Sequence, residues 1–251
     1  MPARPITTWN VLHRVHAINW DEPAILQHPD ERTRIARIAD LVATWCVPGA
    51  VIGLQEVSGD QLAALRARAP AGARIFAHAY PRVPRLRAQG AAAVLADPRE
   101  HLVVIACDEA ARVVEARTFG EDPGKGLLAV ALGDGGAFIC THVSFGDRRT
   151  AQLQVIGAVA SAISGMVVVA GDFNATLADV RGALGAGAAY ADVAGQPLRT
   201  RRGEGSAGND VDIDHVIVLR GEIEGAAVIE DGWLSDHRPV RATVWPRSIR
   251  T

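Results

Sequence analysis

The chain has 251 residues, of which 49% are hydrophobic and 22% charged, with a formal net charge of −2. This length can bury a substantial core, and we expect residues 1–251 to form a single domain. The near-neutral charge excludes a protein coated in positive charge, but it leaves room for a local basic groove that holds phosphate.

Strand and helix patterns alternate in the first part of the chain. Residues 6–12 (ITTWNVL) predict a buried strand, and a polar loop rich in His, Asn and Asp follows it. Residues 30–46 place apolar side chains on one helical face, with Asp30 as the N-cap. Residues 50–57 predict a second short strand, and residues 58–69 predict a helix that a proline stops.

The rest of the chain contains mostly strand patterns. Six runs between Gly, Pro or Asp turns predict strands at residues 73–80, 90–96, 101–107, 111–118, 126–132 and 137–143. Residues 147–164 predict a long amphipathic helix, and later strands are expected at residues 167–174, 211–219 and 238–245. The composition of residues 181–209 is typical of a long loop with at most a short helix. Many strands with few helices predict two packed sheets flanked by helices.

Polar residues gather where the apolar strands end. Taken singly, each has an ordinary structural explanation, as a turn former, a solvated edge or a hydrogen-bonded core histidine. Together they mark the ends of five separate strands, and this pattern favours a catalytic site over separate structural roles. The set consists of Asn10, Glu56, His142, Asp172, Asn174, Asp212, Asp214, His215, Asp236 and His237.

Oxygen-bearing side chains in this set suit a divalent cation. Mg²⁺ prefers one or two carboxylates together with water and substrate oxygens, and Mn²⁺ accepts the same ligands. Glu56 is the best ligand, with Asn10 and Asp236 contributing through their oxygens or through bound waters. A cation held there neutralises phosphoryl charge and polarises the P–O bond, so the set predicts metal-assisted attack on a phosphoester.

The remaining side chains suit the activation of water. Asp172 and Asn174 are two residues apart, lie on one side of an extended backbone and can orient an attacking water. His237, steadied by Asp214, can hold or protonate a phosphate oxygen. His142 offers a second imidazole near the leaving group. These residues predict hydrolysis by in-line attack of water.

Six motifs in order, TWNVL, LQEV, THVSF, GDFN, DIDHV and SDHRPV, resemble those of the endonuclease/exonuclease/phosphatase superfamily. Its members are metal-dependent phosphoesterases of DNase I-like fold, and the resemblance extends over residues 6–245. It implies an α/β fold, a four-layered αββα sandwich of two packed, mostly antiparallel β-sheets flanked by helices. It also implies an active site at one end of the two sheets.

At the matched positions the resemblance implies the roles given above for each residue, with Asn10 and Glu56 at the metal. It leaves open whether Asp172 or His237 is the base. One departure is Asp212, which stands where many relatives have Arg. This extra carboxylate faces solvent, binds a second cation, or disfavours a highly anionic substrate.

Two arginine clusters in predicted loops are candidate phosphate-binding groups. Arg82, Arg85 and Arg87 form the first, and Arg201 with two neighbouring arginines forms the second. Both clusters equally match the solvated surface of an Arg-rich chain with few lysines. With few aromatic residues and near-neutral charge, we expect a small phosphorylated metabolite, nucleotide or lipid headgroup as substrate, with DNA or RNA as the alternative.

Other classes of function remain open. A non-catalytic phosphate-binding module of this fold would be expected to lack Glu56, Asp172 or His237, and the chain keeps all three. A zinc hydrolase needs His-rich ligand sets, for which residues 13–16 (HRVH) are a weak candidate. Residues 13–22 equally suit a pocket wall or ordinary packing, as does Trp233.

The setting of the protein follows weakly from its cysteines and its apolar runs. The three cysteines lie in apolar stretches without zinc spacing, so we expect reduced core residues. The N-terminus lacks the apolar region of a signal peptide, and no run approaches membrane-spanning length. We therefore expect a cytoplasmic protein without membrane insertion, and the sequence implies no partner protein.

Overall fold

Two six-stranded β-sheets pack face to face in the computed structural model, with helices on both outer faces. The structure describes residues 3–88, 94–184, 187–193, 195–203 and 210–247. This arrangement confirms the four-layered α/β sandwich that the sequence predicts.

The strands of each sheet come from distant parts of the chain. The first sheet runs in the order β11 (Gly221–Val228), β12 (Val240–Pro246), β1 (Arg4–Asn10), β2 (Val51–Ser58), β4 (Glu100–Ala106) and β3 (Arg74–Ala79). The second runs in the order β5 (Arg112–Phe119), β6 (Asp122–Ala131), β7 (Ala137–His142), β8 (Val167–Asp172), β10 (Asp214–Leu219) and β9 (Ala188–Tyr190). Only the β1–β2 and β7–β8 pairs of the described strands are parallel, so the sheets are mostly antiparallel as expected.

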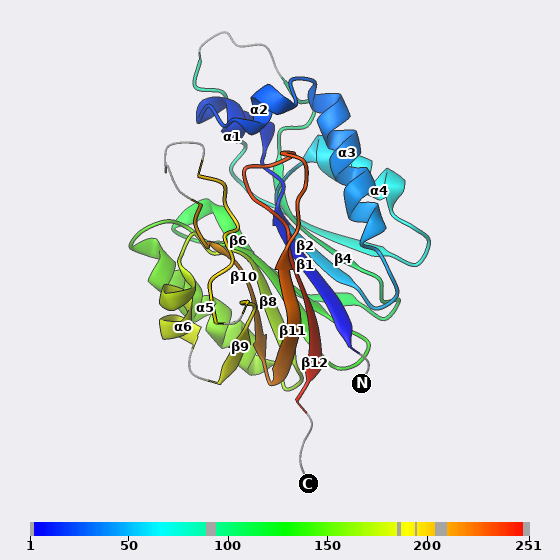
Figure 1. The fold of residues 1–251 in the computed structure, drawn as a ribbon, viewed down its shortest axis with the longest axis vertical. Helices are drawn as coiled ribbons and strands as arrows, with labels where there is room; N and C mark the ends of the chain where they lie inside the picture. The colour runs from blue at the N-terminus through cyan, green and yellow to red at the C-terminus, as the bar shows by residue number, and fades with distance from the viewer. Residues whose placement is uncertain (1–2, 89–93, 185–186, 194, 204–209, 248–251) are drawn as a thin grey trace.

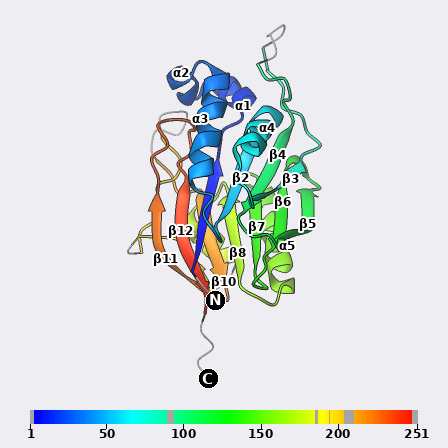
Figure 2. The ribbon, with the colours of Figure 1, turned by 90° about the vertical axis from the view of Figure 1, so that its right-hand side faces the viewer.

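Helices cover the two outer faces and one end of the sandwich. The helices are α1 (Arg14–Asn19), α2 (Ala24–Gln27), α3 (Glu31–Thr44), α4 (Gly59–Arg68), α5 (Arg148–Ala162) and α6 (Leu177–Leu184). α3 and α4 lie on one side of the sheets and α5 with α6 on the other, while α1 and α2 lie at the end away from both termini (Figure 1 and Figure 2). No helix among the described residues is both long and apolar enough to cross a bilayer.

The two predicted helices that precede and follow β2 begin at side-chain caps. The carboxylate of Asp30 accepts hydrogen bonds from the backbone N–H groups of Arg32 and Thr33 at the start of α3. Ser58 and Gln61 form a reciprocal capping box at the start of α4. Each cap satisfies backbone donors that the first helical turn leaves unpaired. Both helices lie where the sequence predicts them.

Several elements differ from the sequence prediction. The polar loop expected after residue 12 contains α1 and α2, because His13 caps α1 through its side chain. The strand predicted at residues 90–96 falls mostly outside the described residues, and its described part, residues 94–96, is not a strand. The edge strands β9 and β11 are absent from the sequence prediction, since β9 has only three residues and β11, half of whose residues are exposed, lacks an apolar run. β9 and the end of α6 occupy part of the loop expected at residues 181–209.

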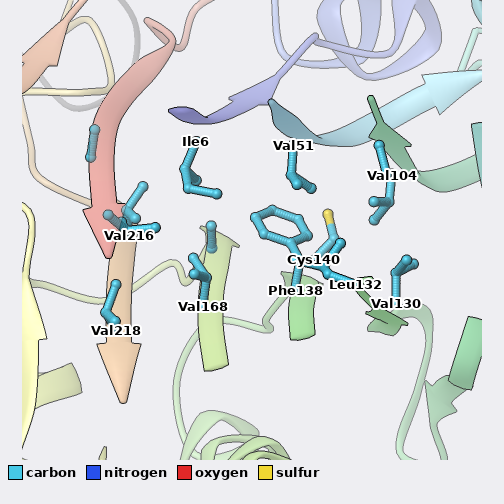
Figure 3. Close-up of a cluster of buried hydrophobic side chains, with 14 of the residues drawn as sticks. Ile6, Val51, Val104, Val130, Leu132, Phe138, Cys140, Val168, Val216 and Val218 are labelled. Atoms are coloured by element: carbon cyan, nitrogen blue, oxygen red, sulfur yellow. The ribbon is translucent and has the colours of Figure 1, made fainter. Parts of the chain in front are cut away.

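The main core lies between the two sheets and is built from their facing aliphatic side chains. Figure 3 shows Ile6 and Val51 of the first sheet opposite Phe138 of the second. Phe138 is fully buried, and a Cβ at Gly53 would lie 2.9 Å from its ring. Glycine at this position therefore lets the two sheets approach, and burial of the ring contributes roughly 2–3 kcal/mol.

The two parallel strand pairs determine where the polar strand ends meet. In the second sheet, His142 pairs with Asp172 in register, and Asp214 pairs with Asp172 from the other side. In the first sheet, Asn10 pairs with Gln55, next to Glu56. Because the sheets pack face to face, these two groups of side chains face one another at the same end of the sandwich.

Candidate active site

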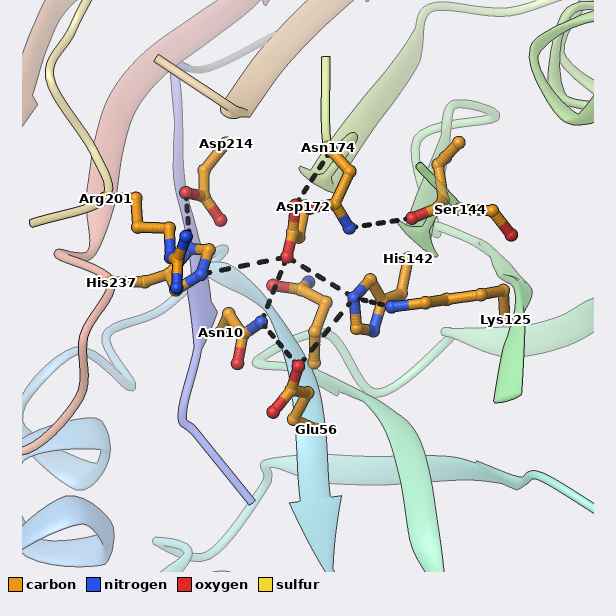
Figure 4. Close-up of polar contacts among 12 residues, drawn as sticks. Asn10, Glu56, Lys125, His142, Ser144, Asp172, Asn174, Arg201, Asp214 and His237 are labelled. Carbon is orange, nitrogen blue, oxygen red and sulfur yellow. Dashed lines mark hydrogen bonds and ion pairs between the residues drawn. The ribbon is translucent and has the colours of Figure 1, made fainter. Parts of the chain in front are cut away.

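Asp172 lies at the centre of the polar cluster and is 2% exposed. Its carboxylate contacts the side chains of Asn10, His142 and His237 and the backbone of Asn174 (Figure 4). Its Oδ1 accepts a hydrogen bond from the backbone N–H of Asn174 (2.9 Å), and its Oδ2 accepts one from Nδ2 of Asn10 (3.0 Å). Burial opposes ionisation, but the hydrogen bond from His142 and the charge of His237 outweigh it and lower the pKa of Asp172. The carboxylate is therefore a buried, fixed anion.

Glu56 lies beside Asp172 at the edge of the first sheet. Nδ2 of Asn10 is 3.2 Å from Oε1 of Glu56, so one amide group contacts both carboxylates. The backbone of Glu56 has φ 58°, at an irregularity in the pairing of β2 with β4. Non-glycine residues seldom adopt this conformation, and at functional sites the strain aims a side chain. Burial opposes ionisation of Glu56, but His16, His142 and Lys125 outweigh it and lower its pKa.

His237 forms a buried ion pair behind Asp172. Its Nδ1 is 2.7 Å from Oδ2 of Asp214, and its Nε2 is 3.9 Å from Oδ2 of Asp172. Burial alone would lower the pKa of His237. The carboxylates around the ring, Asp214 first, raise it instead to about 10. At neutral pH the imidazole is therefore positively charged and directs Nε2 toward the centre of the site.

A second imidazole, His142, approaches Asp172 from the opposite side. Its Nε2 is 3.3 Å from Oδ2 of Asp172 and contacts Nζ of Lys125. Behind the ring, Nδ1 lies 3.9 Å from Oε1 of the buried Glu100. Glu100 also accepts a hydrogen bond from His16 (3.0 Å). Each imidazole that flanks Asp172 thus has a buried carboxylate behind it.

An open pocket of about 220 Å³ gives solvent access to these groups. Arg201 crosses its rim, where its guanidinium is 2.9 Å from Glu22 and 3.3 Å from Asp236. Burial would lower the pKa of Arg201, but the charges of Asp236 and Glu22 raise it. The pocket therefore contains both carboxylates and basic side chains, which suits an anionic group that enters together with a cation.

The structure brings most of the predicted site residues to this pocket. Those that line it are Glu56, His142, Asp172, Asn174, Arg201, Asp236 and His237, while Asn10 and Asp214 contact them from behind. Asp236 lies near His237 and forms an ion pair with Arg201, so its described charged partners are these two residues rather than Glu56.

Other candidates lie elsewhere. Arg82, Arg85 and Arg87 are absent from the described pocket lining, and Arg82 faces Asp122 at 3.7 Å. Asp212 accepts a hydrogen bond from the backbone N–H of Leu177 (3.0 Å), so it holds the start of α6.

The first histidine of the HRVH motif, His13, has a structural role. Nδ1 of His13 accepts from the backbone N–H of Val15, and Nε2 lies 3.1 Å from the carbonyl of Pro98. With both ring nitrogens engaged, His13 is unsuited to bind zinc. Trp233 is also outside the described pocket lining, and the centre of its ring lies 4.7 Å from the Arg202 guanidinium. Of the two segments considered as pocket walls, only residues 13–22 contribute to the lining, through His16, Trp20 and Glu22.

Three charged residues of the site were not found from the sequence. Glu22 and Glu100 follow no apolar strand end, so nothing in their local pattern separates them from surface acids. Lys125 precedes the apolar part of β6, and its residue type is the one feature of the sequence that singles it out. It is the sole lysine among the 26 Lys and Arg residues of the chain.

Solved structures similar to this chain match it along nearly its whole length. D. rerio TDP2 in complex with single-strand DNA product has 16% sequence identity and a TM-score of 0.70, covering 97% of this chain and 99% of that one. The human Nocturnin catalytic domain with bound sulfate anion has 16% identity and a TM-score of 0.69, covering 98% and 95%. An endonuclease/exonuclease/phosphatase from Bacteroides vulgatus has 19% identity and a TM-score of 0.67, covering 98% and 100%. At these identities the likeness shows the shared fold.

Comparison at the level of sequence gives the family. No curated protein matches the chain significantly. The model of the Endonuclease/Exonuclease/phosphatase family matches residues 7–237, almost the full length. The chain therefore belongs to this family of phosphoester hydrolases.

Proposed function

We propose that the protein hydrolyses a small phosphorylated molecule with the help of a divalent cation, by in-line attack of water on phosphorus. One observation carries the proposal: the buried carboxylate of Asp172 lies between two imidazoles, 3.3 Å from Nε2 of His142 and 3.9 Å from Nε2 of His237. A fixed anion between two potential proton donors suits a reaction that takes a proton from water and stabilises charge on phosphate oxygens.

Mg²⁺ is the proposed cation, with Mn²⁺ as a substitute. Glu56 would hold it, because its carboxylate and that of Asp172 meet at the Asn10 amide and offer the oxygen atoms that hard cations prefer. Asn10 would contribute through a bound water, since its Nδ2 donates to both carboxylates and its Oδ1 accepts from the backbone N–H of Leu12. Asp236 would contribute through a bound water, since its own Oδ2 pairs with Arg201. When bound, such a cation neutralises phosphoryl charge and polarises the P–O bond.

The group Asp172, Asp214 and His237 also has ligand atoms within 4.8 Å of one another. It is a poorer metal site, because Asp214 and His237 already share a hydrogen bond of 2.7 Å. A cation on His237 would also have to displace the proton that three carboxylates stabilise on the ring. We therefore assign the cation to Glu56 and keep the histidine as a proton-bearing group.

The chain's own groups divide the proton transfers. Asp172 orients the attacking water and accepts its proton while the water oxygen forms the new bond to phosphorus. His237 is protonated at neutral pH and donates a hydrogen bond to a non-bridging phosphate oxygen. The bond from phosphorus to the ester oxygen breaks, and that oxygen takes a proton from the imidazole of His142, which flanks Asp172. This scheme assigns the base to Asp172 rather than His237.

A small substrate is supported by how the arginines are used. Of the six arginines in the two candidate phosphate-binding clusters, Arg201 alone appears in the described pocket lining. No track of unpaired arginines leads from the described part of the pocket toward Arg82, which faces Asp122. The alternative, cleavage of DNA or RNA, has support from the similar fold of TDP2 bound to single-strand DNA product. Three free cysteines support a reducing compartment such as the cytoplasm.

Hydrolysis of bis(p-nitrophenyl) phosphate tests the proposal. Chelation is expected to abolish activity, and Mg²⁺ or Mn²⁺ to restore it. Glu56→Gln and His237→Ala should each lower kcat by about 10³-fold or more, with the fold unchanged by circular dichroism. Asp40→Asn, a change on the exposed face of α3, is the matched control. Activity that survives chelation, or a folded Glu56→Gln variant with wild-type turnover, would refute the proposal and favour a non-catalytic phosphate-binding module.

A further inference from the structure

Two aromatic side chains lie exposed at the pocket. Trp20 is 60% exposed and Phe145 is 68% exposed, and both line the pocket. Trp20 follows α1, whereas Phe145 lies between β7 and α5, so two distant segments each contribute one ring. Single exposed apolar residues are common on protein surfaces, but two large rings at one polar pocket form a surface suited to a ligand.

The indole of Trp20 is held in place by the neighbouring loop. The guanidinium of Arg87 lies 4.1 Å from the centre of the ring. Asn19 anchors that loop twice, because its Nδ2 donates to the carbonyl of Arg85 and its Oδ1 accepts from the backbone N–H of Arg87, both at 2.9 Å. An exposed ring that is already ordered loses little conformational entropy when a ligand stacks on it.

We propose that Trp20 and Phe145 bind a nucleobase of the substrate, next to the phosphate that the catalytic groups receive. This inference rests on the proposed function and narrows its substrate to a nucleobase-bearing phosphate. Every nucleobase has a flat π-face that stacks on aromatic side chains, whereas a sugar phosphate has none. A quaternary ammonium headgroup would also seek aromatic rings, but Arg87 already places a positive charge over Trp20 and would repel it.

A mononucleotide and the end of a single strand present the same base and phosphate. Binding measurements separate the base from the phosphate: AMP and ribose 5-phosphate differ only by adenine. We expect AMP to bind at least about tenfold more tightly in isothermal titration. A 5′-phosphorylated tetra-adenylate then distinguishes the two sources, because it binds more tightly than AMP when further nucleotides are contacted and equally when the site takes a mononucleotide.

Variants locate the base. Trp20→Ala and Phe145→Ala are each expected to remove most of the preference for AMP while leaving the affinity for ribose 5-phosphate within twofold. Trp20→Phe should restore part of the preference. Leu26→Ala, which truncates a side chain 79% exposed and absent from the described pocket lining, is the matched control and should change neither ligand. Equal affinities for AMP and ribose 5-phosphate in the wild type, or equal losses for both in the aromatic variants, would overturn the inference.

Hydrolysis of two esters with the same leaving group separates this inference from the proposed function. Thymidine 5′-(p-nitrophenyl phosphate) and ethyl p-nitrophenyl phosphate both release p-nitrophenolate, and we expect kcat/KM to favour the nucleoside ester about tenfold. Equal hydrolysis of the two esters would leave the proposed function standing and overturn base recognition. Selective AMP binding without hydrolysis of either ester would do the reverse.

Discussion

Replacing Asp214 with Asn removes one negative charge from the pair with His237 and keeps the shape of the side chain. The two partners are 2.7 Å apart, and their side chains are 0% and 5% exposed. Hydrogen bonds to charged groups contribute about 1.5–3 kcal/mol, and the lack of solvent screening places this pair in the upper half of that range. We therefore expect kcat/KM to fall by about 50- to 150-fold, which corresponds to about 2.3–3 kcal/mol.

The pH profile of the same variant tests the cause of the loss. Because the carboxylates raise the pKa of His237 to about 10, its protonated form persists in the wild type until the pH approaches that value. Without the charge of Asp214 the pKa falls, so the alkaline limb of kcat/KM should move to lower pH. Rates on bis(p-nitrophenyl) phosphate at saturating Mg²⁺, over the range from pH 6 to about pH 9.5 in which Mg²⁺ stays dissolved, would measure both effects.

Two controls complete this experiment. Thermal unfolding checks that Asp214→Asn folds, and Asp40→Asn removes an exposed carboxylate that pairs with Arg68 on the molecular surface. A folded Asp214→Asn variant with activity within threefold of wild type and an unchanged alkaline limb would refute the role given to the Asp214–His237 pair.

Three substitutions test the packing that positions the site, each by denaturant unfolding. Gly171→Ala would put a Cβ 1.9 Å from the carbonyl oxygen of Thr141 on the neighbouring strand, and it should lower the free energy of unfolding by at least about 2 kcal/mol. Gly182→Ala, in the open surface of α6, should instead raise it by roughly 0.5–1 kcal/mol. Similar effects of the two substitutions would contradict the close packing described at Gly171. Ser58→Ala removes one half of a capping box and should cost about 1 kcal/mol, a loss that Ser58→Asp should largely avoid. Arg34→Met leaves three buried carbonyls without their donor and should cost at least about 3 kcal/mol, so wild-type stability in this variant would show that water replaces the guanidinium.

Local patterns predict the central elements well because their signals lie within a few residues. The apolar runs of β2, β7 and β8 and the Asp30 cap of α3 are complete in the sequence itself. β11 is different: it contains two glycines and two glutamates, and only its pairing with β12 makes it a strand. α1 has six residues and is too short to be stable alone, so its formation depends on tertiary contacts.

For the candidate site, the residue types were predictable and their partners were not. The strand-end rule finds Asn10 and Glu56, but only the fold shows that one amide group contacts Glu56 and Asp172 together. Arg201 comes from an irregular loop, and its partner Glu22 is 179 positions away. Such pairings depend on how the two sheets are stacked, which no local pattern encodes.

The single lysine of the chain lies in this pocket, so a chemical label directed at lysine would mark the pocket selectively. Amine-reactive acylating reagents do not modify arginine, and Lys125, which lines the pocket and contacts His142, carries the one lysine ε-amino group of the chain. Acylation at Lys125, measured on the peptide that contains it, would then report vacant sites, and any compound that enters the pocket would slow that labelling. Occupancy can therefore be followed by mass spectrometry for ligands that are not hydrolysed at all.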